Sequence, residues 1–257
     1  MASTPRAIGT ARDPGPDTAR RRLATAAMVG VVLYIAVDVV LQFLPPHYNP
    51  ISEAESDLAV GPFGWIMNVN FLARAVLSGC AVAALARVGT PTRLRTAGLW
   101  LFAVAGLCSA ALAFFATDVA PTGDALGGDA QSGVVPAGYG DAPAVHGDAP
   151  AVHGDAPAVH GVATTTTTGA IHLALATGGF VAALVAFALL TVWMRGVPAL
   201  RSGYRSAQVF LVIAVVGILS LGASIAFVPG VLGLAERLCL AGILGWVFVV
   251  CAAVRRV

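Results

Sequence analysis

The arginines of this chain alternate with its apolar runs, and this alternation most constrains what the chain can fold into. All fifteen basic residues are arginine, and thirteen of them lie before the first apolar run, in every second gap between runs or after the last run. The remaining three gaps contain no arginine, and two of them contain acidic residues. Because basic loops of membrane proteins face the cytoplasm, this pattern predicts an all-α, polytopic membrane protein. It also predicts that both termini are cytoplasmic (N-in, C-in).

Six segments are long and apolar enough to cross a bilayer, which requires about twenty apolar residues. They are residues 23–44, 63–86, 96–117, 169–194, 206–228 and 231–254. With 58% hydrophobic and 11% charged residues, the chain has too little polar surface for a water-soluble globule. We therefore predict one six-helix bundle in the cell membrane, spanning residues 23–254. The turn at Pro229-Gly230 predicts that the last two helices are neighbours.

Two further segments are predicted to lie outside the membrane. Residues 1–22 are rich in proline, arginine and threonine without apolar periodicity, which is typical of a disordered cytoplasmic tail. Residues 119–168 form an extracytoplasmic loop that contains three tandem copies of Asp-Ala-Pro-Ala-Val-His-Gly between Asp141 and Gly161. The repeated histidines could hold a transition metal loosely, but Pro and Gly in every copy favour a low-complexity spacer. We assign this loop no catalytic role.

Polar residues within the apolar segments concentrate in the half of the bundle predicted to face outward. On the first helix Tyr34, Asp38 and Gln42 share one face at helical spacing. At 1.5 Å per residue, Asp38 and Arg237 both lie about 10 Å below the outer boundary, which predicts that they face each other. Charged residues at this depth must face the bundle interior, because exposure to lipid is costly.

Two interpretations of these buried polar residues remain open. The first is structural: interhelical ion pairs that fix the packing. The second is functional: a polar pocket open to the outer leaflet, in which an arginine holds an anionic head group or a substrate carboxylate. The ligand-binding candidates are Asp38, Asn70, Arg74, Glu236 and Arg237.

The first outer loop contains a capping-box pattern, Ser52 followed by Glu55, which predicts a short helix at the membrane surface. This loop and the ends of the third and fourth helices also supply the residue types of a hydrolase. Ser52 or Ser56 as nucleophile could combine with His172 as base and with Asp57 or Asp118 as the residue that orients it. Alternatively, the same region could bind zinc through a set of four ligands, namely His47, Asp57, Asp118 and His172.

Several short motifs resemble those of a known family. They are HYNPIS at residues 47–52, SDL at 56–58, FFATD at 114–118, TGAIH at 168–172 and GLAER at 233–237, followed by Trp246. These motifs resemble the bacterial and archaeal six-helix membrane family catalogued as domain of unknown function 998. The resemblance covers residues 23–254 and implies a six-helix membrane fold, but it implies no reaction. The tandem-repeat loop departs from the compact pattern of the family.

Two functional classes follow from these observations. The chain is predicted to bind or transport an amphipathic or anionic small molecule reached from the extracytoplasmic side, with membrane lipids as its other partners. The alternative is an intramembrane, hydrolase-like enzyme acting on a lipid or another outer-leaflet substrate. The chain has no P-loop, dinucleotide fingerprint or haem-type histidine pair, which disfavours nucleotide-driven transport and electron transfer, and no cofactor is indicated. The net charge of +2 reflects orientation in the membrane and not nucleic-acid binding.

Overall fold

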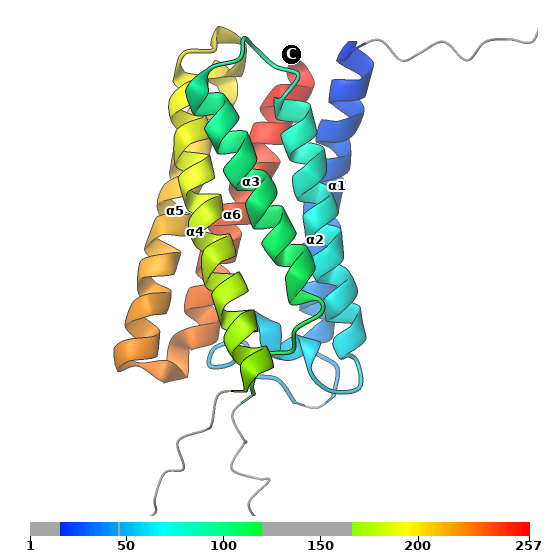
Figure 1. Cartoon of the computed structure of the whole chain (residues 1–257), viewed down its shortest axis with the longest axis vertical. Helices are drawn as coiled ribbons and strands as arrows, with labels where there is room; N and C mark the ends of the chain where they lie inside the picture. Colours follow the sequence, from blue (N-terminus) through cyan, green and yellow to red (C-terminus); the bar gives the residue numbers. More distant parts are fainter. Residues whose placement is uncertain (1–15, 46, 120–165) are drawn as a thin grey trace, which may run out of the picture. The chain divides into compact units, whose positions relative to one another are not determined.

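The computed structural model describes residues 16–45, 47–119 and 166–257, and within these ranges it is helical without β-strands (Figure 1). Most of the predicted tail and the whole tandem repeat lie outside the described residues. Residues 16–22, predicted as tail, instead begin the first helix. Pro16 has the fixed φ that suits a helix start, and Asp17 pairs with Arg20 one turn later at 3.0 Å.

The six predicted membrane-spanning helices are confirmed, and all six are long and apolar enough to cross a membrane. Their bounds are α1 Pro16–Leu41, α2 Gly64–Leu85, α3 Arg93–Leu112, α4 Thr167–Arg195, α5 Arg201–Phe227 and α6 Leu232–Arg256. Within the described ranges, three short 3₁₀ helices connect or flank them: η1 Glu55–Ala59, η3 Pro198–Leu200 and η4 Pro229–Val231.

The helices form a ring in chain order. Helix α6 closes this ring and also occupies part of its interior. Each helix packs on the next, and α6 returns to pack on α1 (Figure 1). The packing of α5 on α6 is the most extensive, as the turn at Pro229-Gly230 predicts. In addition, α6 contacts α2 and α4 across the ring and is the most buried of the six helices. The interior of the bundle is therefore organised around α6.

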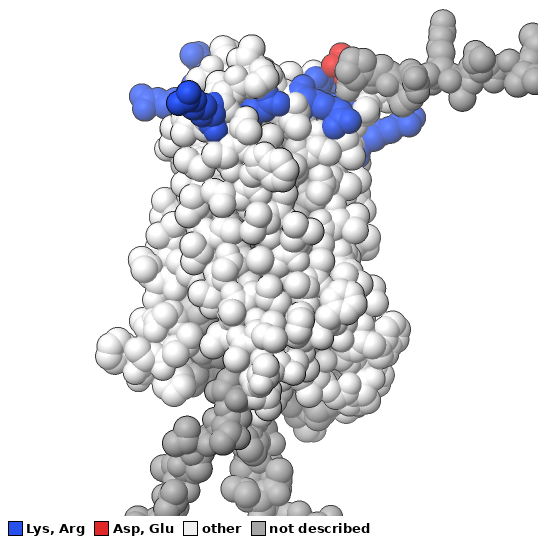
Figure 2. All heavy atoms as spheres, viewed as in Figure 1, with Lys and Arg blue, Asp and Glu red and all other residues white. Residues whose placement is uncertain are grey.

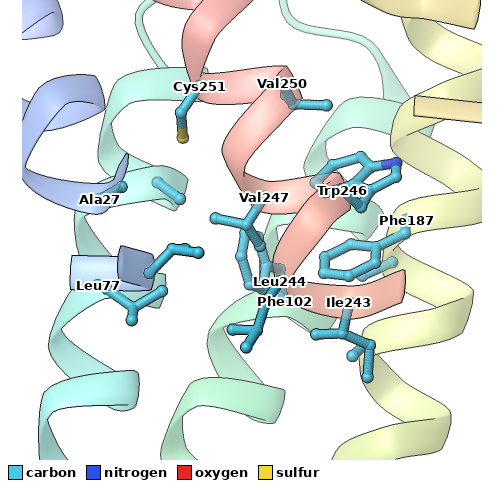
Figure 3. Close-up of a cluster of buried hydrophobic side chains, with 14 of the residues drawn as sticks. Ala27, Leu77, Phe102, Phe187, Ile243, Leu244, Trp246, Val247, Val250 and Cys251 are labelled. Carbon is cyan, nitrogen blue, oxygen red and sulfur yellow. The ribbon is translucent and has the colours of Figure 1, made fainter. Parts of the chain in front are cut away.

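Aromatic side chains from three helices form the centre of this interior (Figure 3). Phe187 of α4 stacks on Trp246 of α6 with ring centroids 4.0 Å apart, and Phe102 of α3 packs edge-on against both rings. The Trp246 indole donates a hydrogen bond of 2.9 Å to Thr191 Oγ1, which satisfies its only polar group. This cluster joins α3, α4 and α6 in the middle of the bundle.

On the face of the bundle that Figure 2 shows, the charged side chains gather at one end. In Figure 2 the arginines form a band around the end of the bundle where α1 begins and α6 terminates. Below this band, the visible surface of the described residues is uncharged. This distribution is the one that the alternation of arginines in the sequence predicts. Which side of the membrane this end faces stays a prediction; the opposite end is called the outer end below.

Candidate functional site

The outer end of the bundle is occupied by the segment that precedes α2, here called the outer segment (residues 47–59, including η1). In Figure 1 this segment lies across the end of the bundle, and η1 contacts both α2 and α6. Two of its side chains enter the interior: Leu58 joins the hydrophobic core, and Glu55 is only 3% exposed. A loop that looked acidic and solvated thus places a carboxyl group inside the bundle.

Glu55 begins a chain of hydrogen bonds that crosses three helices. Tyr34 Oη of α1 donates to Glu55 Oε1 at 2.9 Å and accepts from Arg74 Nη1 of α2 at 3.3 Å. Arg74 Nε donates to Ser109 Oγ of α3 at 2.8 Å, and Ser109 donates in turn to the carbonyl of Phe71 at 3.0 Å. Tyr34 therefore bridges the buried acid and the buried base, which do not meet directly.

Helix α6 holds the backbone of the outer segment. Glu236 accepts a hydrogen bond of 2.7 Å from the backbone N–H of Glu55. Arg237 donates to the carbonyl oxygens of Pro50 and Glu53 at 3.0 and 3.4 Å and to Tyr48 Oη at 2.7 Å. Successive residues of a helix point about 100° apart, so Glu236 and Arg237 bind different parts of the same segment.

The buried charges do not form ion pairs with one another. Among residues 16–45, 47–119 and 166–257, only Arg20 and Asp17 approach within 4.0 Å as an ion pair. Asp38 and Arg237, which were predicted to face each other, lie close enough for each to act on the charge of the other, but they form no ion pair, because Arg237 binds the outer segment. Asp38 Oδ2 instead accepts from Gln42 at 2.7 Å. Its Oδ1 is buried without a hydrogen-bond partner among the described residues, and its carboxyl group lies beside that of Glu55.

Burial changes the proton affinity of the acidic groups on the outer segment. Loss of hydration, together with the neighbouring carboxyl groups of Asp38 and Glu236, raises the pKa of Glu55 to about 8. Burial also raises the pKa of Asp57 to about 6. Glu55 is therefore an acid that holds its proton at neutral pH, inside a cluster of other carboxyl groups.

The predicted capping box between Ser52 and Glu55 does not form, and Ala54 and Asp57 cap the short helix instead. The short helix exists, but η1 begins after Ala54, and Asp57 Oδ2 accepts the backbone N–H of Ala54 at 3.0 Å. Ser52 does not start the helix, and Glu55 points inward and does not cap it. The sequence motif indicated a helix start in the correct loop but at the wrong residues.

The hydrolase candidates are not joined by hydrogen bonds. Asp118 accepts from the backbone N–H and the hydroxyl of Thr166 at 2.9 and 2.7 Å, at the start of α4. His172 Nδ1 lies 2.7 Å from the carbonyl oxygen of Phe115, and its Nε2 is buried without a partner in the described part of the chain. No hydrogen bond among these residues connects His172 to Ser56, Asp57 or Asp118.

The four-residue zinc set is not assembled either. His47 is exposed, whereas His172 is only 4% exposed at the start of α4. Within the described ranges, no three His, Cys, Asp or Glu side chains are placed so that they could hold a metal ion. The carboxylates of Asp57 and Asp118 each accept a hydrogen bond from a backbone N–H at a helix start, and this local role explains both residues.

A small cavity of about 40 Å³ lies against Arg74, on the side away from the outer segment. Its polar lining comes from Arg74, Ser78 and Ser109; its apolar lining includes Phe102, Phe180 and Leu244. Asn70, another predicted ligand-binding residue, does not line this cavity; its Nδ2 donates to the backbone carbonyl of Tyr34 at 3.2 Å. Asn70 therefore braces α1 against α2.

The structure brings together four of the five predicted ligand-binding residues around the outer segment: Asp38, Arg74, Glu236 and Arg237. Sequence reasoning missed the central residues of the cluster, Glu55, Tyr48 and Ser109, as site residues. For Tyr34 a signal existed, because it shares a helix face with Asp38. For Glu55 no local signal existed, since nothing in an acidic loop distinguishes the one residue that turns inward.

Comparison with known proteins adds the family but no reaction. No curated protein and no solved structure matches the chain. The family described as "Protein of unknown function (DUF998)" matches residues 28–253, which include the outer segment and all six helices apart from the first turns of α1 and the last three residues of α6. The matched region thus contains the buried polar cluster as well as the bundle that holds it. The chain belongs to the DUF998 family.

Proposed function

We propose that this membrane protein binds a small anionic or amphipathic molecule in the outer half of the bundle, with Arg74 holding its negative group. The observation that carries the proposal is that Arg74 is a charged side chain within the membrane span without an acidic partner among the described residues. Its guanidinium lies within the apolar span of α2, has no carboxylate oxygen within 4.0 Å among the described residues, and borders a cavity.

An arginine in this position needs compensation for its lost hydration. Insertion of arginine near the centre of a membrane helix costs about 2.5–3.5 kcal/mol. The rings of Tyr34 and Phe71 lie 5.6 and 5.8 Å from the Arg74 guanidinium carbon, and Ser109 accepts one hydrogen bond. These neutral contacts stabilise the cation without neutralising it. An anionic ligand would supply the missing negative charge through a charge-assisted hydrogen bond.

The cavity restricts the kind of ligand. A cavity of about 40 Å³ accommodates a small group, and a larger ligand requires the lining side chains to move. Because Phe102 and Phe180 line the part beyond Arg74, an apolar group attached to the anion would lie toward the centre of the bundle. An alkyl carboxylate, whose chain requires the lining side chains to move, has both features.

The alternative function, an intramembrane hydrolase, receives less support. A general base must reach the proton of its nucleophile, directly or through one water. In the described residues His172 is hydrogen-bonded to a backbone carbonyl and to no serine. We therefore retain ligand binding as the proposed function.

The proposal is tested by ligand-dependent thermal stability in lipid nanodiscs, with octanoate as the probe and 1-octanol as its neutral counterpart. A ligand at ten times its Kd stabilises the folded state by about 1.4 kcal/mol. We expect octanoate to raise the Tm of the wild-type protein, 1-octanol to leave it unchanged, and Arg74→Gln to abolish the response.

Two further variants complete the test. Arg87→Gln serves as the matched control, because Arg87 follows α2 at the arginine-rich end and should leave the octanoate response intact. Arg74→Lys keeps the charge, so it should preserve part of the response even if Arg74→Gln folds poorly. Equal stabilisation by octanoate and octanol, or an unchanged response in Arg74→Gln, would refute the proposal.

A further inference from the structure

The outer segment is fastened to the bundle by a set of polar contacts, in addition to the buried side chain of Leu58. Arg237 and Glu236 of α6 bind its backbone, Tyr34 of α1 binds Glu55, and the backbone N–H of Leu234 donates to the carbonyl of Ile51 at 3.0 Å. Gly233 permits this close approach, because a Cβ there would collide with the carbonyl oxygens of Glu53 and Pro50. The segment is thus docked in one defined position on α6.

One end of the segment contains a glycine in a backbone conformation that other residues rarely adopt. Gly61, between η1 and α2, has a φ of 87°, in the left-handed region that glycine adopts without strain. A glycine at this point allows the chain to change direction before α2 begins at Gly64. The outer segment can therefore turn away from the bundle without unfolding α2.

The contact most sensitive to charge is the one made by Glu55. Its carboxyl group is buried beside that of Asp38, and the groups that face it come from every helix packed around it: Tyr34 and Asp38 of α1, Arg74 of α2, and Glu236 and Arg237 of α6. Asp38 Oδ1 has no donor among the described residues. A proton on Glu55 allows the two carboxyl groups to share a hydrogen bond, whereas two carboxylates at this separation repel each other.

We propose that the outer segment is a lid over the Arg74 site, latched by the protonated Glu55 carboxyl group and released when that proton is lost. Loss of the proton leaves two or more carboxylates together in a buried cluster, and outward rotation of the lid about Gly61 returns Glu55 to water. The raised pKa of Glu55, about 8, is consistent with a latch that is closed at neutral pH and opens under alkaline conditions. This inference does not rest on the identity of any ligand.

Hydrogen–deuterium exchange of the full-length protein in nanodiscs tests the latch without a ligand. The measured quantity is the protection of the amides of residues 48–60 at pH 6 and pH 9, corrected for the intrinsic pH dependence of exchange. The opening equilibrium of a lid held by one proton shifts by up to tenfold per pH unit while the proton is retained in the closed state. We expect wild-type protection to fall by about tenfold or more, with protection of α4 unchanged.

Two variants distinguish the latch from general alkaline loosening. Glu55→Gln keeps an acceptor for Tyr34 but cannot ionise, so its lid should stay protected at both pH values. Glu53→Gln removes a neighbouring acid whose carboxylate binds only the backbone N–H of Asn49, so it should behave as the wild type does. Asp38→Asn removes the repelling partner and should reduce the pH effect, which provides a test should Glu55→Gln fold poorly.

The proposal fails under either of two results. Wild-type protection that is the same at pH 6 and pH 9 would show that Glu55 does not control the lid. A loss of protection in Glu55→Gln as large as in the wild type would assign the pH effect to another group.

Discussion

At the scale of single residues, Tyr34 is the neutral side chain that links the buried acid Glu55 to the buried Arg74. Its side chain is 1% exposed, and its hydroxyl donates to Glu55 and accepts from Arg74. A neutral bridge of this kind avoids placing a full ion pair in a low-dielectric interior, where desolvation offsets much of the Coulomb attraction. The Tyr34 hydroxyl also sets the distance between Glu55 of the lid and Arg74 of the proposed binding site.

Replacement of this hydroxyl is therefore expected to be costly. Tyr34→Phe leaves Glu55 without its donor and Arg74 with one acceptor fewer, and a buried group left unsatisfied costs about 1–3 kcal/mol. We expect a loss of this size in the free energy of unfolding, measured by denaturant titration in detergent. Tyr204→Phe is the control, because Tyr204 lies at the arginine-rich end beside Arg201 and Arg205 and should change stability little. Equal losses in the two variants would contradict the assigned role.

At the scale of the helices, α5 and α6 approach each other through small residues. A Cβ on Gly217 would collide with the backbone of Cys239, and a Cβ on Gly242 would collide with the backbone of Ala214. Each helix thus supplies one glycine that receives the other helix. Close packing of this kind replaces the hydrophobic effect, which does not drive helices together in lipid.

The two interfacial glycines are expected to be intolerant of even a methyl group. Gly242→Ala should destabilise the bundle by about 1–3 kcal/mol, because α5 and α6 must move apart to accommodate the methyl group. Gly222→Ala, on α5 with no atom within 4 Å of the added Cβ, should be neutral or slightly stabilising. Thermal unfolding of both variants in the same detergent provides the comparison. A neutral Gly242→Ala variant would show that the interface is looser than described.

The success of the sequence in predicting elements was uneven for physical reasons. The spans were predictable because the length and apolarity that the bilayer demands leave a strong local signal, as in α4 and α5. The start of α1 was misplaced because helix formation from Pro16 depends on the proline and on the pair of Asp17 with Arg20, and not on hydropathy. The inward turn of Glu55 was not predictable, since it depends on contacts with Tyr34 and Glu236 that are distant in sequence. The depth of Arg237 along its helix could be calculated from the sequence, but its hydrogen-bond partners could not be predicted from it.

At the scale of the whole molecule, the described residues have a strongly basic end and an outer end whose charged side chains are hydrogen-bonded. Eleven arginines lie near the basic end: Arg20, Arg21, Arg22, Arg87, Arg93, Arg95, Arg195, Arg201, Arg205, Arg255 and Arg256. An even number of helices places the start of α1 and the end of α6 together at this end. By the positive-inside rule, this end should face the cytoplasm.

Labelling of introduced cysteines in intact cells tests this orientation. Gly230→Cys, in the exposed turn between α5 and α6, should react with a membrane-impermeant maleimide added from outside. Ala199→Cys, exposed in η3 at the basic end, should react only after the cells are permeabilised. The wild-type protein provides the background, because its four cysteines lie within the membrane spans. The reverse pattern would invert the orientation.

The central position of α6 has a consequence for how the protein is made. Of the six helices, α6 leaves the ribosome last, yet it supplies Trp246 to the aromatic centre and holds the lid through Arg237. The five helices inserted before it therefore wait in the bilayer without the helix around which they pack. Tertiary structure in this protein is completed only when synthesis of this region ends, and any chain truncated before α6 would present an unfilled interior to the quality-control machinery of the membrane.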